Sequence, residues 1–220
     1  VVSSVDRDIM QEFSPELRVE IVSNIHEVRG SATSFHKRDG ILFVGGFEHP
    51  PNTDAVTYYV QEILPLIRQN LGGTKTYIVG SNPPPTITSL ASHDIIVTGY
   101  VKDVSRYFNK CRVSIAPLRY GSGVKGKINM SMSYGLPVVA TSIAAEGMFL
   151  RSEFDVLIAD DVKSFADAVV RLYSDELLWN KLSANGLNNL EKYFSKSVAR
   201  ETLENILALN PIDKGCSTCK

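Results

Sequence analysis

Short apolar runs, each long enough for one β-strand, recur along the 220-residue chain and limit its choice of fold most strongly. Several of them, such as ILFV at 41–44 and IIV at 95–97, are apolar throughout instead of alternating with polar residues. This pattern is typical of parallel strands that are covered on both faces. We predict strands at 18–22, 41–44, 76–79, 95–98, 112–116, 137–141 and 156–158.

Longer segments with helical spacing separate the predicted strands. Apolar residues recur with this spacing over 53–71, where two glycines then supply a stop. Further helices are predicted at 103–110, 125–134, 162–173, 175–193 and 196–209. The repeated order of strand and helix predicts an α/β fold, a doubly wound (Rossmann-like) parallel sheet with helices on both faces.

Charge and composition exclude several classes of function. Lysine and arginine number 23 against 24 acidic residues, so the formal net charge of -1 gives no overall attraction to nucleic acid or to an anionic membrane. Three cysteines, an odd number, do not make a disulfide framework and suit a reducing compartment. No apolar run approaches the roughly 20 residues that span a bilayer. We expect a cytoplasmic protein, and one whose natural start is missing because the chain opens on Val1.

The first candidate site follows the strand predicted at 41–44. In doubly wound sheets, ligands bind beyond the carboxyl ends of the strands. Here Gly45 and Gly46 lead through a loop that carries His49 into a helix. Two glycines let backbone N–H groups approach a phosphate, and the helix start adds about half a positive charge. A tight turn before the helix explains the same residues, and both interpretations stay open.

The second candidate site follows the strand predicted at 112–116 and is the more informative one. Its sequence, PLRYGSGVKGK, combines a Gly-Ser-Gly turn with Arg119, Lys125 and Lys127 at a helix start. A diphosphate needs access to the backbone, a helix dipole and cations, and this segment offers all three. Cations at a helix N-terminus oppose its dipole, which favours an anionic partner over the alternative of solvated lysines.

Other motifs carry less information. Glu146 follows the carboxyl end of the strand predicted at 137–141, where a carboxylate accepts hydrogen bonds from ligand hydroxyls or serves in the first turn of a short helix. Cys216 and Cys219 form a C-x-x-C in a polar tail with no second pair, so we interpret it as incidental. The dinucleotide fingerprint G-x-G-x-x-G, the hydrolase motif G-x-S-x-G and any set with metal-ligand spacing are missing from the sequence.

Five blocks together resemble the carboxyl-terminal, donor-binding domain of retaining GT-B glycosyltransferases of the glycosyltransferase family 4 group. They are ILFVGGFEHPPNTDAV, TYIVGSNPPP, DIIVTGYVKDV, RVSIAPLRYGSGVKGKINMSMSYGLPVVATSIAAEGM and KYFSKSVARETLENIL, in the family's order over roughly residues 38–208. The resemblance implies transfer of a sugar, with retention, from a nucleotide diphosphate sugar to a glycan or another acceptor. It also implies that an acceptor-binding amino-terminal domain is missing, so that the chain is inactive alone.

The resemblance divides the chain and assigns residues to its site. Residues 1–30 are expected to be a junction and first strand, 31–208 the donor-binding domain and 209–220 a flexible tail. Base and ribose would lie near residues 80 and 99–103, and the diphosphate at the two glycine loops and their cations. The expected donor-binding residues are Gly45, Gly46, His49, Gly80, Gly99, Tyr100, Val101, Asp103, Gly121, Ser122, Gly123, Val124 and Lys127. Arg119, Lys125 and Glu146 are expected to be catalytic, with no metal and no other cofactor.

Two departures from the family leave alternatives open. Ser122 and Met130 occupy the positions of two glutamates that the family usually carries, so those roles do not transfer, and Glu146 is our candidate substitute for one of them. A degenerate GT-B half that binds nucleotide sugar weakly, or offers an interaction surface, is therefore the alternative function. A nicotinamide-dependent oxidoreductase fits the sheet but lacks the fingerprint. Expected partners are the nucleotide sugar and, through the missing half, an acceptor glycan and a peripheral membrane contact; nucleic acid is not expected.

Overall fold

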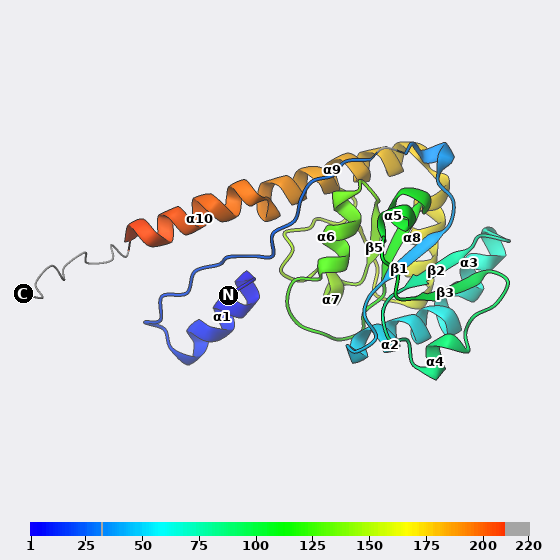
Figure 1. Cartoon of the computed structure of the whole chain (residues 1–220), viewed down its shortest axis with the longest axis horizontal. Helices are drawn as coiled ribbons and strands as arrows, with labels where there is room; N and C mark the ends of the chain where they lie inside the picture. The colour runs from blue at the N-terminus through cyan, green and yellow to red at the C-terminus, as the bar shows by residue number, and fades with distance from the viewer. Residues whose placement is uncertain (32, 210–220) are drawn as a thin grey trace, which may run out of the picture.

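The computed structural model of the chain describes residues 1–31 and 33–209 (Figure 1). In this part of the chain, six parallel strands form one sheet in the order β3–β2–β1–β4–β5–β6, which confirms the predicted doubly wound fold. The strands are β1 (Ile41–Val44), β2 (Thr76–Val79), β3 (Ile95–Gly99), β4 (Val113–Ala116), β5 (Val138–Ala140) and β6 (Leu157–Ile158).

The strand order reverses at the centre of the sheet, between β1 and β4. Leu42 of β1 is in register with Tyr77 of β2 on one side and with Ser114 of β4 on the other. The carboxyl ends of β1 and β4 are therefore neighbours, and the segments that leave them diverge to opposite faces. Such a reversal point is where ligands of doubly wound sheets bind.

Helices cover both faces of the sheet (Figure 1). One face carries the continuous segment α2 (Pro50–Tyr58), η2 (Tyr59–Ile63) and α3 (Leu64–Asn70) together with α8 (Val162–Ser174), and its core includes Ile41 and Phe43. On the other face, α5 (Ser105–Lys110) packs over Leu42 and Val79, next to α6 (Gly126–Ser133). α9 (Glu176–Phe194) packs along α6, and the short elements are η1 (Phe35–Lys37), α4 (Pro85–Thr88) and α7 (Ser142–Ala145).

The helix predicted over 53–71 contains one wide turn, η2, which has π-helical hydrogen bonds. The N–H of Leu64 reaches back five residues to the carbonyl of Tyr59. Pro65 follows directly, has no N–H, and its ring crowds the carbonyl four residues earlier. The widened turn makes room for this ring, so that the helix continues into α3 instead of breaking.

Arg38 is completely buried and joins the ends of two helices. Its Nη1 donates to the carbonyls of Phe108 (2.5 Å) and Cys111 (2.9 Å) at the end of α5, and its Nη2 to that of Tyr134 (3.3 Å) at the end of α6. The last carbonyls of a helix have no partner within it and carry partial negative charge. One guanidinium therefore caps both helices at the sheet edge opposite the strand carboxyl ends. Burial lowers the pKa of Arg38 to about 10.

The strand predicted at 18–22, in the segment before η1, is not present in the structure. Residues 18–22 form no strand, although their side-chain pattern favours one. The segment runs instead beside the first residues of the chain, where the N–H of Val22 donates to the carbonyl of Val1 at 2.9 Å. A strand needs a neighbouring strand to pair with, and the edges of the sheet, β3 and β6, lie elsewhere. The chain thus enters the sheet at β1.

Two helices extend beyond the sheet. α1 (Ser4–Phe13) lies to one side, and α10 (Lys196–Leu209) continues from the end of α9 away from the sheet (Figure 1). The helices predicted at 162–173, 175–193 and 196–209 are confirmed as α8, α9 and α10. Almost all of the predicted flexible tail, with Cys216 and Cys219, lies outside the described residues.

Candidate functional site

A cleft of about 450 Å³ opens beyond the carboxyl ends of β1 and β4. One wall is the start of α2, which follows β1, and the other is the loop that joins β4 to α6. The residues that line it are His49, Pro51, Asn52, Leu118, Tyr120, Gly121, Ser122, Val124, Lys125, Gly126 and Lys127. The structure thus brings together His49 and most of the second predicted glycine loop.

The loop after β1 needs glycine for close backbone packing. The N–H of Gly45 continues the sheet by donating to the carbonyl of Val79 at 3.0 Å. A Cβ on Gly80 would lie 1.9 Å from the carbonyl oxygen of Gly45. One on Gly45 would lie 2.8 Å from the side chain of Asn52. Gly80 was predicted near the base and ribose, but its visible role is to seat the loop that carries Gly46.

Asn52, in the first turn of α2, links the two walls of the cleft. Its Nδ2 donates to the carbonyl of Gly46 at 2.7 Å, and its Oδ1 accepts from Nζ of Lys127. The side chain is almost fully buried, with 7% of it exposed. No local pattern in the sequence marks this residue, because an asparagine after two prolines is ordinary at a helix start.

Two glycines with positive φ shape the other wall. Gly121 has φ 129° and Gly123 has φ 71°, conformations that side chains with a Cβ disfavour. Lys125 folds back over this turn, and its Nζ donates to the carbonyl of Gly123 at 2.6 Å. Burial lowers the pKa of Lys125, against the opposite effect of Glu146 and Asp6. Next comes the N-terminus of α6, whose first N–H groups have no partner within the helix.

Lys127 lies at the inner end of the cleft. Its Nζ is 4.4 Å from the centre of the Phe43 ring and donates to Asn52. In the described residues, no carboxylate oxygen lies within 4 Å of Nζ of either Lys125 or Lys127. Burial, reinforced by the charge of Lys125, lowers the pKa of Lys127 to about 7. The cleft therefore contains two lysines that no carboxylate of the described residues contacts, an arrangement that favours an anionic ligand.

Arg119 is placed differently from these lysines. Its guanidinium forms a two-point ion pair with Asp54 on α2, and it lies 4.8 Å from the centre of the Tyr58 ring. Its charge is thus already compensated, and its pKa is raised mainly by the hydrogen bond to Asp54. Arg119 is not among the residues that line the cleft.

Glu146 and residues 99–103 lie outside the lining of the cleft. Glu146 is exposed directly after α7, near enough to Lys125 to act on its pKa. Tyr100, Val101 and Asp103 line a separate open hollow of about 660 Å³ beyond β3. Gly99 ends β3 with φ 67° and accepts from the N–H of Gly80 at 3.3 Å.

Asp103 also shares a second hollow with Met130, where the resemblance implies a glutamate. Its Oδ1 accepts a hydrogen bond of 2.9 Å from the N–H of Ser105, the first residue of α5. Hydrogen bonding to Ser105 lowers the pKa of the Asp103 carboxyl group. Asp103 and Met130 line a common hollow of about 310 Å³ together with Lys102 and Arg29. Met130 thus contributes a thioether to a hollow that Asp103 lines from another loop.

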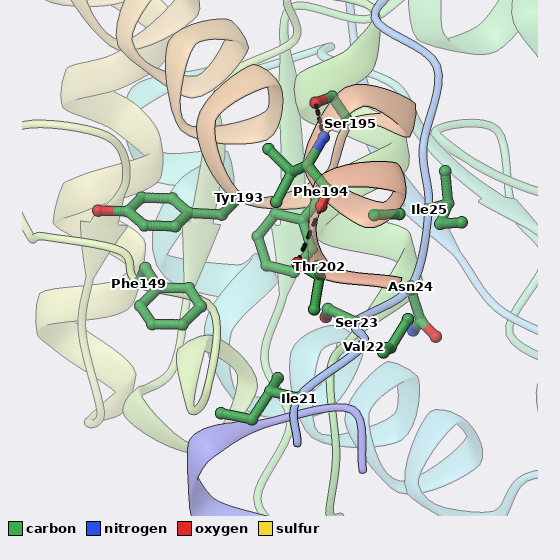
Figure 2. A pocket seen from close by; sticks show the side chains of 12 residues that line it. Ile21, Val22, Ser23, Asn24, Ile25, Phe149, Tyr193, Phe194, Ser195 and Thr202 are labelled. Carbon is green, nitrogen blue, oxygen red and sulfur yellow. Dashed lines mark hydrogen bonds between the residues drawn. The ribbon is translucent and has the colours of Figure 1, made fainter. Parts of the chain in front are cut away.

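A further hollow of about 200 Å³ lies between the amino-terminal segment and the junction of α9 with α10 (Figure 2). Figure 2 shows that Ile21 and Val22 of the amino-terminal segment line it from one side and Phe149, Tyr193 and Phe194 from another. The rings of Phe149 and Tyr193 are stacked with centroids 4.4 Å apart. None of the predicted site residues lines it, and its surface is mainly apolar.

Comparisons with known proteins agree with this architecture. A model of the family described as glycosyl transferases group 1 matches residues 38–175. Sucrose-phosphate synthase of Spinacia oleracea is 33% identical over 81 residues, which are 36% of this chain and 8% of that protein.

Two solved structures share the fold. S. aureus TarM, in complex with Fondaparinux, alpha-GlcNAc-glycerol and UDP, superposes with a TM-score of 0.78 at 17% identity, over 94% of this chain and 43% of that one. The C-terminal domain of the Francisella tularensis protein LpcC, a glycosyl transferase group 1 family protein, gives a TM-score of 0.60 at 14% identity, over 77% of this chain and 97% of that one. The chain thus spans less than half the length of TarM and less than a tenth of the spinach protein. None of the described helices is both long and apolar enough to cross a membrane.

Proposed function

This chain belongs to the glycosyl transferases group 1 family, and we propose that it is the donor-binding part of a retaining enzyme that transfers a sugar from a nucleotide diphosphate sugar. The acceptor, a glycan or another hydroxyl compound, would bind to a further domain. The proposal takes its reaction class from the family and its donor from the chemistry of the cleft.

One observation carries the proposal, namely the two lysines without counter-ions beside the N-terminus of α6. A diphosphate in the cleft would meet the ammonium groups of Lys125 and Lys127, the Gly121–Gly123 turn and the first N–H groups of α6. These groups would also stabilise the charge that develops on the diphosphate as it leaves the sugar. UDP is our first candidate donor nucleotide, because UDP is bound in the TarM structure.

Other residues take secondary roles in this proposal. The exposed carboxylate of Glu146 would accept hydrogen bonds from sugar hydroxyls, and residues 99–103 would contact the base. Arg119 would brace the wall of the cleft unless its guanidinium leaves Asp54 when the donor binds. No metal ion is needed to neutralise the diphosphate when two cations and a helix dipole already face it.

A second function is favoured by Ser122 and Met130. Neither side chain replaces a carboxylate, and Met130 lines a hollow where the family usually has a glutamate. A domain that binds nucleotide sugar weakly without transferring it, or presents an interaction surface, would tolerate both changes. The two functions differ in turnover, since only the first releases a nucleoside diphosphate in the presence of an acceptor.

Calorimetric titration of the 220-residue chain with UDP, GDP, dTDP and NAD, each with and without Mg²⁺, tests the proposal. We expect metal-independent binding of one nucleoside diphosphate, weakened about tenfold or more in Lys127→Met. The matched control is Lys163→Met, because Lys163 is exposed and is also the second residue of its helix. Preferential binding of NAD, or equal weakening by both variants, would overturn the donor-site assignment. Retention is tested by the anomeric configuration of the product that the complete enzyme forms.

A further inference from the structure

The amino-terminal half of α2 holds two cations from the opposite wall of the cleft, and it holds them with different chemical groups. Asp54 binds Arg119 through a carboxylate, whereas Asn52 binds Lys127 through an amide oxygen. The carboxylate neutralises its cation, while the amide orients its cation and leaves the charge intact. The two contacts therefore have opposite consequences for an incoming anion.

We propose that Asn52 is a positioning residue of the phosphate site, which holds the ammonium group of Lys127 at the inner end of the cleft with its charge free for the donor diphosphate. This inference rests on the proposed function and assigns a role to a residue that would not itself contact the reacting atoms.

The orientation of the Asn52 amide is determined by its surroundings. Its Nδ2 donates to the carbonyl of Gly46, so its Oδ1 faces Lys127. The space on its other side is closed, since even a Cβ on Gly45 would lie 2.8 Å from this side chain. Lys127 is confined in turn by the Phe43 ring at 4.4 Å. Both ends of the amide are thus used, and neither partner adds negative charge to the lysine.

The absence of a counter-ion makes the protonation of Lys127 sensitive to the ligand. Burial and the neighbouring Lys125 lower the pKa of Lys127 to about 7. His49 lines the same cleft, Glu146 acts on Lys125 from outside it, and no carboxylate in the described residues approaches Lys127 within 4 Å. A bound diphosphate would raise this pKa, so binding above pH 7 would take up a proton.

Asn52→Asp tests the role with almost no change of shape. The new carboxylate would pair with Lys127, raise its pKa and repel the diphosphate. We expect the affinity of the wild-type chain for UDP to fall roughly fivefold to tenfold between pH 6.5 and pH 8, as proton uptake at a group with a pKa near 7 requires. For Asn52→Asp we expect affinity at pH 6.5 to be about tenfold weaker, with that lysine-dependent fall removed.

Asn52→Ala and Asn70→Asp complete the design. Asn52→Ala removes both contacts without adding charge, so affinity should weaken several-fold while the inflection near pH 7 remains. Asn70 is exposed on α3, and Asn70→Asp should bind as the wild type does. Titration of the Lys127 side chain by ¹³C NMR, with labelled lysine, assigns the inflection to this residue and separates it from His49 and from the ligand.

Each outcome decides the matter. A pH profile that Asn52→Asp leaves unchanged, or a Lys127 that titrates as an ordinary lysine, would overturn the inference while the proposed function stands. An Asn52→Asp protein that fails to fold leaves Asn52→Ala to decide, since undiminished affinity in that variant would overturn it equally. If the wild-type chain binds no UDP at any pH, the UDP assignment and this inference fall together.

Discussion

Arg119 and Asp54 form a two-point ion pair that joins the loop after β4 to α2. Nε of Arg119 lies 2.9 Å from Oδ2 of Asp54, and a terminal nitrogen contacts Oδ1. About half of the Arg119 side chain is exposed. The guanidinium is therefore already occupied in the free protein, whereas the ammonium groups of Lys125 and Lys127 are not matched by a carboxylate.

This difference predicts unequal effects on donor binding. Arg119→Ala should weaken the binding of UDP less than about fivefold, because it removes only a half-exposed ion pair that braces the wall, and such a pair contributes about 0–1 kcal/mol. Lys127→Met should weaken it about tenfold or more, since it removes a charge-assisted contact worth roughly 1.5–3 kcal/mol. Calorimetry on both variants measures the two effects. Equal losses would mean that Arg119 leaves Asp54 when the donor binds and takes the diphosphate-binding role expected for it from the sequence.

The stability of the protein should rise with pH above 7 because of Lys127. Its pKa is about 7 in the folded chain, against 10.5 for an ordinary lysine. Between these values the unfolded chain holds a proton that the folded one has released, so the free energy of unfolding increases, by at most about 5 kcal/mol at 1.36 kcal/mol per pKa unit. Urea unfolding of the wild type and Lys127→Met from pH 6.5 to 9.5 measures this, and Lys163→Met is the control. If the difference in free energy of unfolding between the wild type and Lys127→Met stays constant over this pH range, the burial of Lys127 is contradicted.

Asp94 should make the stability of the protein rise with pH as well, but in the acid range. The guanidinium of Arg68, with hydrogen bonds of 2.7 and 2.9 Å, is the main cause that lowers the pKa of the buried Asp94 carboxyl from 3.8 to about 2. Its contribution is therefore complete above pH 3.8 and is lost as the pH falls through 2, an effect of about 2 kcal/mol. Unfolding curves for the wild type and Asp94→Asn should converge between pH 4 and 2, while exposed Asp167→Asn shows no such convergence.

Arg38→Met should destabilise the fold without acting at the cleft. The substitution fills a similar length but leaves the carbonyls of Phe108, Cys111 and Tyr134 without their buried donor. We expect a loss of about 3 kcal/mol or more, because each unsatisfied buried acceptor costs roughly 1–3 kcal/mol. Urea unfolding measures the loss, and Arg200→Met on the exposed side of α10 is the matched control. Similar stability in the two variants would show that water replaces the guanidinium.

Much of the fold follows from the sequence because parallel strands are apolar on both faces. The strands at 41–44, 76–79 and 95–98 were predicted to within one residue of their observed ends. The predicted alternation of strands and helices along the chain also agrees with the parallel sheet. Residues 18–22 show the limit of this signal. Their side chains favour extended backbone, but pairing depends on which edge of the sheet is near, and a sequence pattern does not contain that information.

The parts of the candidate site that depend on local backbone shape could be predicted from the sequence. The parts that depend on contacts between residues far apart in the chain could not. The Gly121–Gly123 turn was predicted from its two glycines, and in the structure both have the positive φ that favours glycine. The partners of the cations were not recognised. Asp54 and Arg119 are 65 residues apart, and Asn52 and Lys127 are 75 apart, so neither contact leaves a local pattern. The sequence therefore suggests the same role for Arg119 as for the two lysines. Only the contacts of the described residues show that Arg119 is paired with a carboxylate while Lys125 and Lys127 are not.

The buried guanidinium of Arg38 also matters for how a ligand would be received at the other end of α6. Because the last turns of α5 and α6 are fastened together there, the carboxyl end of α6 is held before any ligand arrives, and its first residues, Gly126 and Lys127, line the cleft. The conformational entropy of arranging this wall is therefore lost during folding and not during binding. A phosphate that enters the cleft meets a rigid receptor, so its affinity should depend on charge and protonation far more than on rearrangement of the chain.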